Sequence, residues 1–382
     1  MRRAELLWLI ALISIGSACK EKQPYPSGKP PSAPDAAPAA PERSTPMPLA
    51  VVITPEGSYL ASARPDGSDL DVRRVSGAVY VRKDGRAVRL EVITKSEDRQ
   101  KNAEESVFSS LVWRLGDGTR TLFPDPGQAR PDLKALARAD PALASLYYHR
   151  ERIRLFAAHG STLSYLVHIE GFLGGAHPYD NNSLLVVDAE TGGPAGSTAS
   201  PADMDFAREA TRTLPPDECV RRFAGVAPAE GLAGEPMFVA VLTHEFEFCR
   251  GRTRLVRVPA PAGPTAIASP SDRTPTPSRA SPSPVQLRNG VLENPSQGLH
   301  EPGVVDYRAS PDGGVVVMLM GLGRSDQAPS VLADLENPKS RELRLWVRGK
   351  TTVPGRASRI LTVQFLMEHP APEAVLDAFS RL

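Results

Sequence analysis

Apolar and polar residues alternate with a period of two along several short segments, which is the pattern of half-buried strands. In 163–169, Leu163, Tyr165 and Val167 are apolar, whereas Ser164 and His168 are polar. Other segments with strand patterns are 79–81, 88–93, 112–115, 119–123, 183–188, 238–248, 253–258, 304–307, 315–320, 343–347 and 360–365. Asp-Gly pairs at 84–85 and 117–118 predict tight turns in two hairpins, because Asp-Gly tolerates positive φ.

Helical patterns are fewer. Asp140-Pro141 suits an N-cap and first helical position, and apolar residues follow at approximate helical spacing as far as Ile153. A second helix is predicted over 372–379, with Leu376 and Phe379 turned inward. Because strands and helices do not alternate regularly, this order predicts an α+β fold.

The first 18 residues have the composition of a secretory signal. Arg2 and Arg3 precede an apolar run over 6–15, which is too short to cross a bilayer, and small residues lead to Cys19. Ile-Gly-Ser-Ala-Cys at 15–19 resembles a bacterial lipoprotein box, in which the cysteine is fatty-acylated and begins the mature chain. The resemblance implies a lipid anchor at Cys19; the alternative is an uncleaved signal anchor.

Prolines divide the rest of the chain. They concentrate in 19–49 and 259–285 among Ala, Ser and Thr, which bury too little apolar area to fold. We therefore expect a disordered tether at 19–49, an α+β domain at 50–258, a disordered linker at 259–285 and a small β-rich region at 286–382. The alternative is that 259–285 is a long loop inside one domain.

Charge and cysteines limit the functional classes. The chain has 45 basic and 44 acidic residues, so it lacks the net basic surface that nucleic-acid binding requires. No later apolar stretch is long enough for a membrane helix. Cys219 and Cys249 are expected to form a disulfide outside the cytoplasm, the alternative being two unpaired thiols.

One segment has the character of a known family. A strand pattern leads into Gly-Gly-Ala-His-Pro at 174–178, and a second strand pattern ends in Asp-x-x-Thr-Gly at 188–192. This segment resembles the extracytoplasmic domain of lysozyme-responsive anti-sigma factors, which also accompanies some peptidoglycan deacetylases. The resemblance implies an antiparallel sheet packed on helices and a binding role. The residues at 193–197 depart from the family pattern, and without a cytoplasmic segment the chain is not expected to be such an anti-sigma factor.

The loop in this segment is the predicted ligand-binding site. Its glycines permit positive φ or close backbone approach, and the proline restricts the preceding histidine to an extended conformation. We expect the loop to project its histidine and tyrosine, either for recognition or as a structural corner. The candidate residues are Gly174, Gly175, Ala176, His177, Pro178 and Tyr179.

Metal and cofactor chemistry finds little support in the sequence. His149, His159, His168 and His177 are too far apart for the short ligand spacings of zinc sites. We assign His149 to an exposed helix face, His159 to a loop and His168 to the polar face of a strand. Paired acids such as Asp203 and Asp205 are expected to be solvated. No metal or cofactor is predicted.

These observations favour a non-enzymatic cell-envelope lipoprotein that binds a lysozyme-like envelope protein or a cell-wall glycan such as peptidoglycan. The absence of an aspartate after Cys19, where Lys20 stands, favours the outer membrane facing the periplasm. The alternatives are a peptidoglycan hydrolase or deacetylase, or its accessory subunit, with His177 as base or ligand, and a structural subunit of an envelope assembly.

Overall fold

The computed structural model describes thirteen parts of the chain: 47–64, 68–97, 105–125, 127, 129–195, 199–214, 219–230, 236–244, 249, 252–260, 284–321, 341–367 and 372–382. The predicted signal, Cys19 and nearly all of the predicted tether and linker lie outside these residues. The first described strand begins at Met47, inside the segment expected to be tether.

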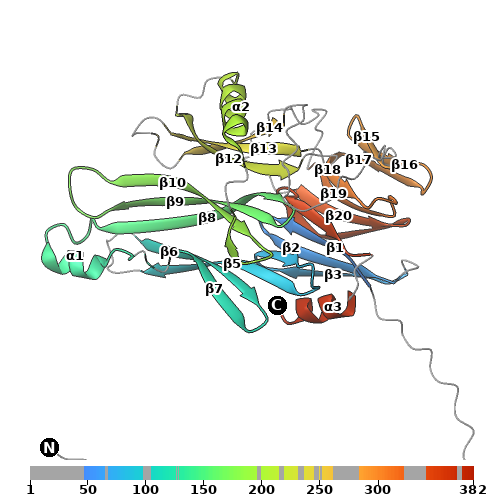
Figure 1. The fold of residues 1–382 in the computed structure, drawn as a ribbon, viewed down its shortest axis with the longest axis horizontal. Helices are drawn as coiled ribbons and strands as arrows, with labels where there is room; N and C mark the ends of the chain where they lie inside the picture. Colours follow the sequence, from blue (N-terminus) through green and yellow to red (C-terminus); the bar gives the residue numbers. More distant parts are fainter. Residues whose placement is uncertain are drawn as a thin grey trace, which may run out of the picture. The chain divides into compact units, whose positions relative to one another are not determined.

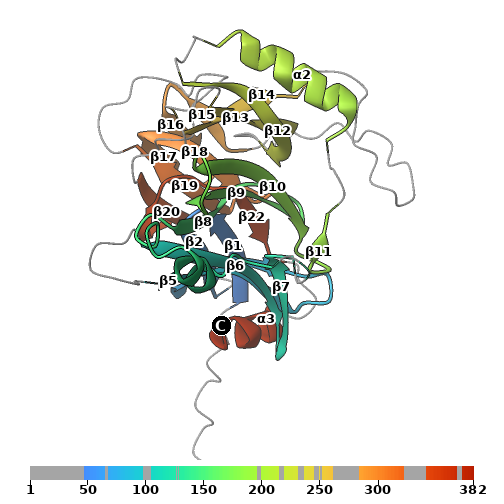
Figure 2. The same cartoon turned by 90° about the vertical axis from the view of Figure 1, so that its left-hand side faces the viewer.

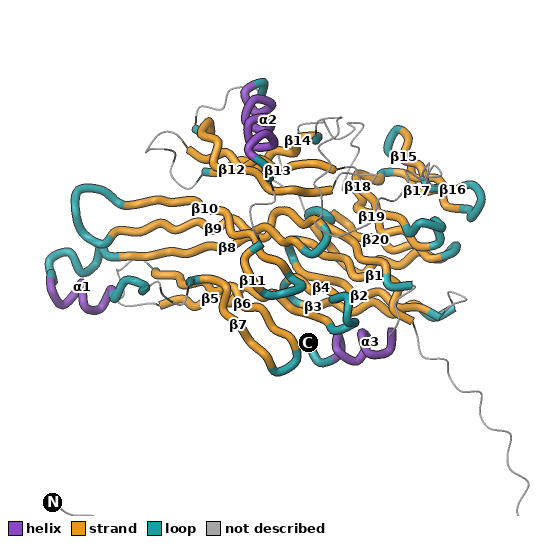
Figure 3. Tube along the Cα trace, in the orientation of Figure 1, coloured by secondary structure: helices purple, strands orange, loops and turns teal. Residues whose placement is uncertain are grey.

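The predicted α+β fold class is wrong, because strands dominate the described residues and helices are few (Figure 3). The described helices are α1 (Leu133–Ala139), α2 (Pro201–Arg212) and α3 (Pro372–Ser380). The helix predicted after Asp140 does not form. Asp140 is instead the C-cap of α1, and its carboxylate accepts hydrogen bonds from the Ala142 and Leu143 N–H groups of a turn. Residues 148–159 instead form a strand that pairs with residues 162–172. This strand pairing outweighs the loose helical spacing of the apolar residues.

The largest sheet has the order β11-β10-β9-β8-β6-β5-β4, with β7 paired to β6. Its strands are β4 (Ala78–Val81), β5 (Ala87–Glu97), β6 (Ser106–Leu115), β7 (Gly118–Phe123), β8 (Tyr148–His159), β9 (Thr162–Phe172), β10 (Tyr179–Asp188) and β11 (Gly193–Pro194). All pairings are antiparallel except a short parallel contact between β6 and β8. Both hairpins predicted from Asp-Gly pairs are confirmed, as β4–β5 and β6–β7.

This sheet folds back on itself, so that β8–β10 lie over β5–β7 (Figure 1). One face of β8–β10 packs against the β4–β6 layer, since Leu155 and Tyr165 share a core with Leu90 and Leu111. On the other face, Leu166 packs in a core with Val239 and Val241 of the small sheet described next. The three strands are thus covered on both faces over part of their length.

Four smaller sheets complete the described fold, in the orders β22-β1-β2-β3, β12-β13-β14, β15-β16-β17 and β18-β19-β20-β21. The strands are β1 (Met47–Thr54), β2 (Gly57–Ala63), β3 (Leu70–Val75), β12 (Val220–Glu230), β13 (Pro236–His244), β14 (Thr253–Pro259), β15 (Gln286–Arg288), β16 (Val291–Asn294), β17 (Leu299–Pro302), β18 (Val304–Ala309), β19 (Val315–Met320), β20 (Arg341–Val347), β21 (Lys350–Ala357) and β22 (Thr362–Phe365).

Strands from the two ends of the described part of the chain lie side by side. β22 pairs with β1, and Tyr59 of β2 packs in one core with Val317 and Leu345 of the region after the predicted linker. The predicted closing helix is confirmed as α3, whose Phe379 is buried in the core of the large sheet. The regions 50–258 and 286–382, separate in sequence, therefore share hydrophobic cores.

The predicted disulfide between Cys219 and Cys249 is confirmed, and both residues belong to the core between α2 and β12–β14. Figure 2 shows α2 next to these strands. Asp203 is not solvated as expected: it is buried in a capping box, where its carboxylate accepts from the Ser200 N–H and hydroxyl groups. None of the described helices combines the length and apolar character needed to cross a bilayer.

Candidate functional site

Two His-x-Glu motifs lie on neighbouring strands but on opposite faces of the sheet. His149 and Glu151 belong to β8, and His168 and Glu170 belong to β9. The register pairs Glu170 with Arg150, whose side chain points away from the face that carries His149 and Glu151. Because side chains alternate between the two faces of a sheet along each strand, the two His-x-Glu motifs lie on opposite faces.

The first motif forms a buried hydrogen-bond network, here called the His149 network, of Ser109, Arg130, His149, Glu151 and Tyr179. His149 Nε2 lies 2.9 Å from Glu151 Oε1, and Glu151 Oε2 accepts from the Ser109 N–H at 2.8 Å. Arg130 donates to the same carboxylate oxygen at 2.7 Å. The other ring nitrogen of His149 is hydrogen-bonded to the Tyr179 hydroxyl. Because His149 is buried on a strand, the predicted exposed helix face is wrong.

The surroundings in this network favour an ionised Glu151 and a neutral Tyr179. Burial raises the pKa of Glu151, but hydrogen bonds from His149 and from the Ser109 N–H, with the Arg130 charge, outweigh it and leave the pKa below its ordinary value. Burial, followed by the Glu151 charge, raises the pKa of Tyr179 to about 12. Tyr179 therefore stays protonated at neutral pH.

Aromatic rings complete the support around this network. Phe108 stacks on the His149 ring at a centroid distance of 5.3 Å, and the Arg130 guanidinium lies 5.4 Å from the Phe108 ring centre. A Cβ added at Gly171 would overlap the Tyr179 hydroxyl and lie 2.6 Å from the Tyr148 carbonyl oxygen. Gly171 is therefore the position that lets Tyr179 reach His149.

The predicted ligand-binding loop connects β9 to β10 at the end of the sheet where α1 lies (Figure 1). The expectation of positive φ is confirmed, at +97° for Gly174 and +104° for Gly175. Gly175, Ala176 and His177 are exposed, as expected for a projecting loop. Tyr179, however, does not project, because its hydroxyl is turned back to His149.

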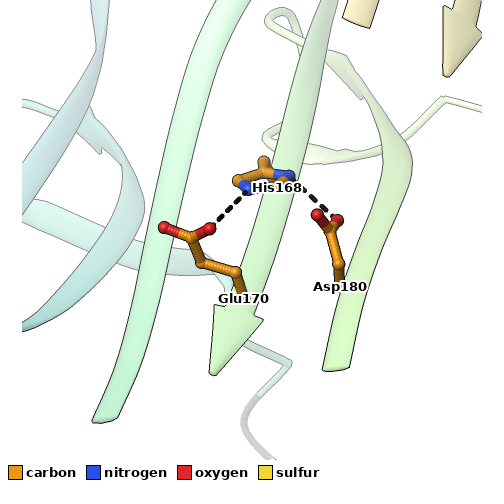
Figure 4. A group of neighbouring side chains, drawn as sticks. All are labelled: His168, Glu170 and Asp180. Atoms are coloured by element: carbon orange, nitrogen blue, oxygen red, sulfur yellow. Dashed lines mark ion pairs between the residues drawn. The ribbon is translucent and has the colours of Figure 1, made fainter. Parts of the chain in front are cut away.

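The second motif gathers a group that the sequence analysis did not find. In Figure 4, the His168 ring lies between the carboxylates of Glu170 and Asp180. His168 Nε2 is 3.7 Å from Glu170 Oε2, and Nδ1 is 3.5 Å from Asp180 Oδ1. The assignment of His168 to a strand is correct, but its side chain is buried. Asp180 reaches the group through the β9–β10 register, a relation that short-range ligand spacing does not reveal.

A depression of about 320 Å³ lies beside the His149 network. Phe108 and Arg130 line it together with two lysines, Lys95 and Lys134. Arg130 thus belongs both to the buried His149 network and to the lining of this depression, which carries positive and negative side chains.

Comparison with known proteins leaves the function open: no family model matches the chain, and no curated protein matches it significantly. The resemblance of 165–192 to the anti-sigma factor domain therefore stays a prediction.

Proposed function

We propose that this chain is a lipid-anchored cell-envelope protein that binds an envelope protein of the lysozyme type or a cell-wall glycan through the loop 173–178. The observation that carries the proposal is an exposed loop whose two ends are attached to a buried framework. An ordered loop loses less conformational entropy on binding than a flexible one, so such a loop suits recognition.

The framework holds the loop from both sides. At its start, a Cβ added to Gly174 would lie 3.5 Å from the Tyr147 ring, and this ring stacks on Phe172 at 6.1 Å. At its end, Tyr179 is tied to His149 and, through it, to Glu151. The loop apex between these anchors offers backbone groups and the His177 side chain to a ligand.

An exposed apolar residue precedes Tyr147, whose ring lies near Gly174 of the loop. Leu146, one residue before Tyr147, has an exposed fraction of 53%, which is high for a large hydrophobic side chain. A surface that combines an exposed leucine, a histidine and glycine backbone resembles the mixed surfaces of protein-binding sites.

Export is supported by the disulfide, since stable disulfides belong to oxidising compartments. It agrees with the lipoprotein box at Cys19, which we propose as the acylation site. Mass spectrometry of native protein is expected to find a mature chain that begins with acylated Cys19. An intact leader in a cytosolic fraction would contradict the anchored location.

The binding proposal is tested with the full-length chain in detergent, using immobilised lysozyme and, separately, purified peptidoglycan. We expect saturable binding to one of them and a loss of affinity of about tenfold or more in His177→Ala and Leu146→Asp. His300→Ala is the matched control, because His300 is an exposed histidine on β17. Binding to neither probe, or equal affinities in the loop and control variants, would overturn the proposal.

A further inference from the structure

We propose that the outer edge of β10 over residues 181–185, here called the β10 edge, binds an extended peptide segment of a protein ligand. The segment adds to the large sheet as one further strand. This inference rests on the proposed recognition of an envelope protein through the loop 173–178. It selects a protein ligand over a glycan, because only a peptide backbone can continue a β-sheet.

β10 is a long strand that is paired almost entirely on one side. Its whole length, Tyr179–Asp188, pairs with β9 without a bulge. On its other side, β11 pairs only with Val187 and Asp188. The described chain places no strand beside the β10 edge. In Figure 1, β10 is the outermost of the strands β8–β10.

The backbone groups that face this edge follow from the hydrogen bonds of its last part. The Ala195 N–H donates to the Val186 carbonyl at 2.9 Å, so the Val186 backbone points away from β9. Backbone groups of an antiparallel strand alternate in direction from one residue to the next. Asn182 and Leu184 therefore also direct their N–H and C=O groups to the edge, whereas Ser183 directs its groups to β9.

These outward groups are available to a ligand. In the described chain, the backbone N–H and C=O groups of Asn182 and Leu184 make no hydrogen bond outside the pairing of β9 with β10. The neighbouring side chains of Asn181 and Ser183 are exposed. The edge thus offers donors and acceptors in the order that an added strand requires.

The side chains along the edge do not oppose strand addition. Edge strands that stay free of partners commonly carry lysine, proline or a bulge. Residues 181–185 are Asn-Asn-Ser-Leu-Leu, without a lysine, an arginine or a proline, and the register with β9 is unbroken. A regular edge of this kind is a template for pairing with another chain.

The position of the edge connects it to the proposed ligand-binding loop. The loop 173–178 ends where β10 begins, at Tyr179, and the Tyr179 hydroxyl is hydrogen-bonded to His149. A peptide that contacts His177 and continues in an extended conformation would therefore run along β10. The edge has room for a segment of roughly five residues before β11, since an added strand matches β10 residue for residue.

A second copy of the chain fits this edge less well than a peptide does. Two copies that pair antiparallel about Ser183 would bring Tyr179 of each copy opposite Val187 of the other. β11 already lies beside Val187, so the two chains would overlap there. A peptide segment that ends before β11 avoids this overlap.

The test compares two substitutions of one edge residue in the full-length chain in detergent, with immobilised lysozyme as the probe. Asn182→Pro removes an outward N–H group, at a place where an edge strand tolerates proline. Asn182→Ala is the matched control, because it loses the same side chain and its hydrogen bond to His168 Nδ1 but keeps the N–H group. We expect about tenfold weaker binding in Asn182→Pro and less than about a twofold change in Asn182→Ala.

Hydrogen exchange gives a second measurement, which needs no variant. In the free chain, the amides of Asn182 and Leu184 are expected to exchange faster than the amide of Ser183, which faces β9. Bound lysozyme is expected to slow the exchange of both edge amides. Unchanged exchange at these amides in a chain that binds lysozyme would overturn the proposal, even if Asn182→Pro fails to fold.

The other outcomes separate this inference from the proposed function. Equal affinities of Asn182→Pro and Asn182→Ala for lysozyme, or binding to peptidoglycan alone, would overturn strand addition and leave the proposed function in place. A dimer of the free chain that dissociates in Asn182→Pro, measured by sedimentation, would assign the edge to a second copy and overturn the proposal. Binding to neither probe would overturn both.

Discussion

The two His-x-Glu motifs of β8 and β9 have the same residue types and spacing, yet the fold treats them differently. His149 and Glu151 are joined by a hydrogen bond of 2.9 Å, whereas His168 and Glu170 stand 3.7 Å apart. The first motif faces the β4–β6 layer, from which Ser109 donates to Glu151. The second faces partly exposed arginines.

This difference shows that the chemistry of a His-x-Glu motif is determined by its partners from elsewhere in the chain and not by the motif itself. Glu151 receives donors from His149, Ser109 and Arg130, so a buried carboxylate remains ionised and fully bonded. Nε2 of His168 makes no hydrogen bond to the described residues, and Glu170 Oε2 lies 3.7 Å from it. The first motif is therefore a fully hydrogen-bonded network, whereas the second is held by longer ion-pair contacts.

The largest expected effect on stability comes from replacing Glu151, the central residue of the His149 network. Glu151→Leu is expected to lower the free energy of unfolding by about 3–5 kcal/mol, because Arg130 and the Ser109 N–H lose their buried acceptor. Glu170→Leu is expected to cost about 1 kcal/mol or less, since its arginine partners are partly exposed. Urea denaturation measures both; equal losses would contradict the comparison.

Gly171→Ala tests the face of the sheet that carries the His149 network by introducing a steric overlap. The new methyl group would overlap the Tyr179 hydroxyl, so we expect a loss of about 1–3 kcal/mol in the free energy of unfolding. Gly193→Ala on β11 is the matched control, because its new Cβ would meet only Thr191 Oγ1 at 3.4 Å.

Tyr179→Phe removes one hydrogen bond and leaves the ring in place. We expect a loss of about 1 kcal/mol in the free energy of unfolding. In histidine NMR spectra, the His149 ring signals should shift more than those of His168. Equal shifts at both rings would show that the two faces are coupled.

The smallest effect concerns pH. The pKa of Glu151 is below its ordinary value of 4.5 in the folded chain, so its ionised form is favoured by folding. The stability that it contributes is complete above pH 4.5 and is lost as the pH falls below this value. Unfolding measured between neutral pH and pH 3 is expected to show a weaker acid dependence in Glu151→Gln than in wild type. An identical dependence in both proteins would contradict the assigned pKa direction.

Local patterns were sufficient for much of the structure. Period-two alternation and Asp-Gly turns predicted the β4–β5 and β6–β7 hairpins, because a hairpin is specified by neighbouring residues. The Cys219–Cys249 disulfide, the closing helix α3 and the positive φ values of Gly174 and Gly175 also followed from the residues themselves.

Long-range pairing decided the rest. Pairing with β9 makes 148–159 a strand, which overturned the α+β class and buried His149. The pairing of β22 with β1 joins segments about 300 residues apart in the sequence. Cross-strand register, which depends on how whole strands align, brought Asp180 to His168 and turned Tyr179 inward. The sequence by itself thus determined the short strands, the turns and the cysteine pair. The tertiary structure alone decided which histidine is hydrogen-bonded through both ring nitrogens and which is held partly by longer ion-pair contacts, because the groups that surround a side chain in a sheet come from distant strands.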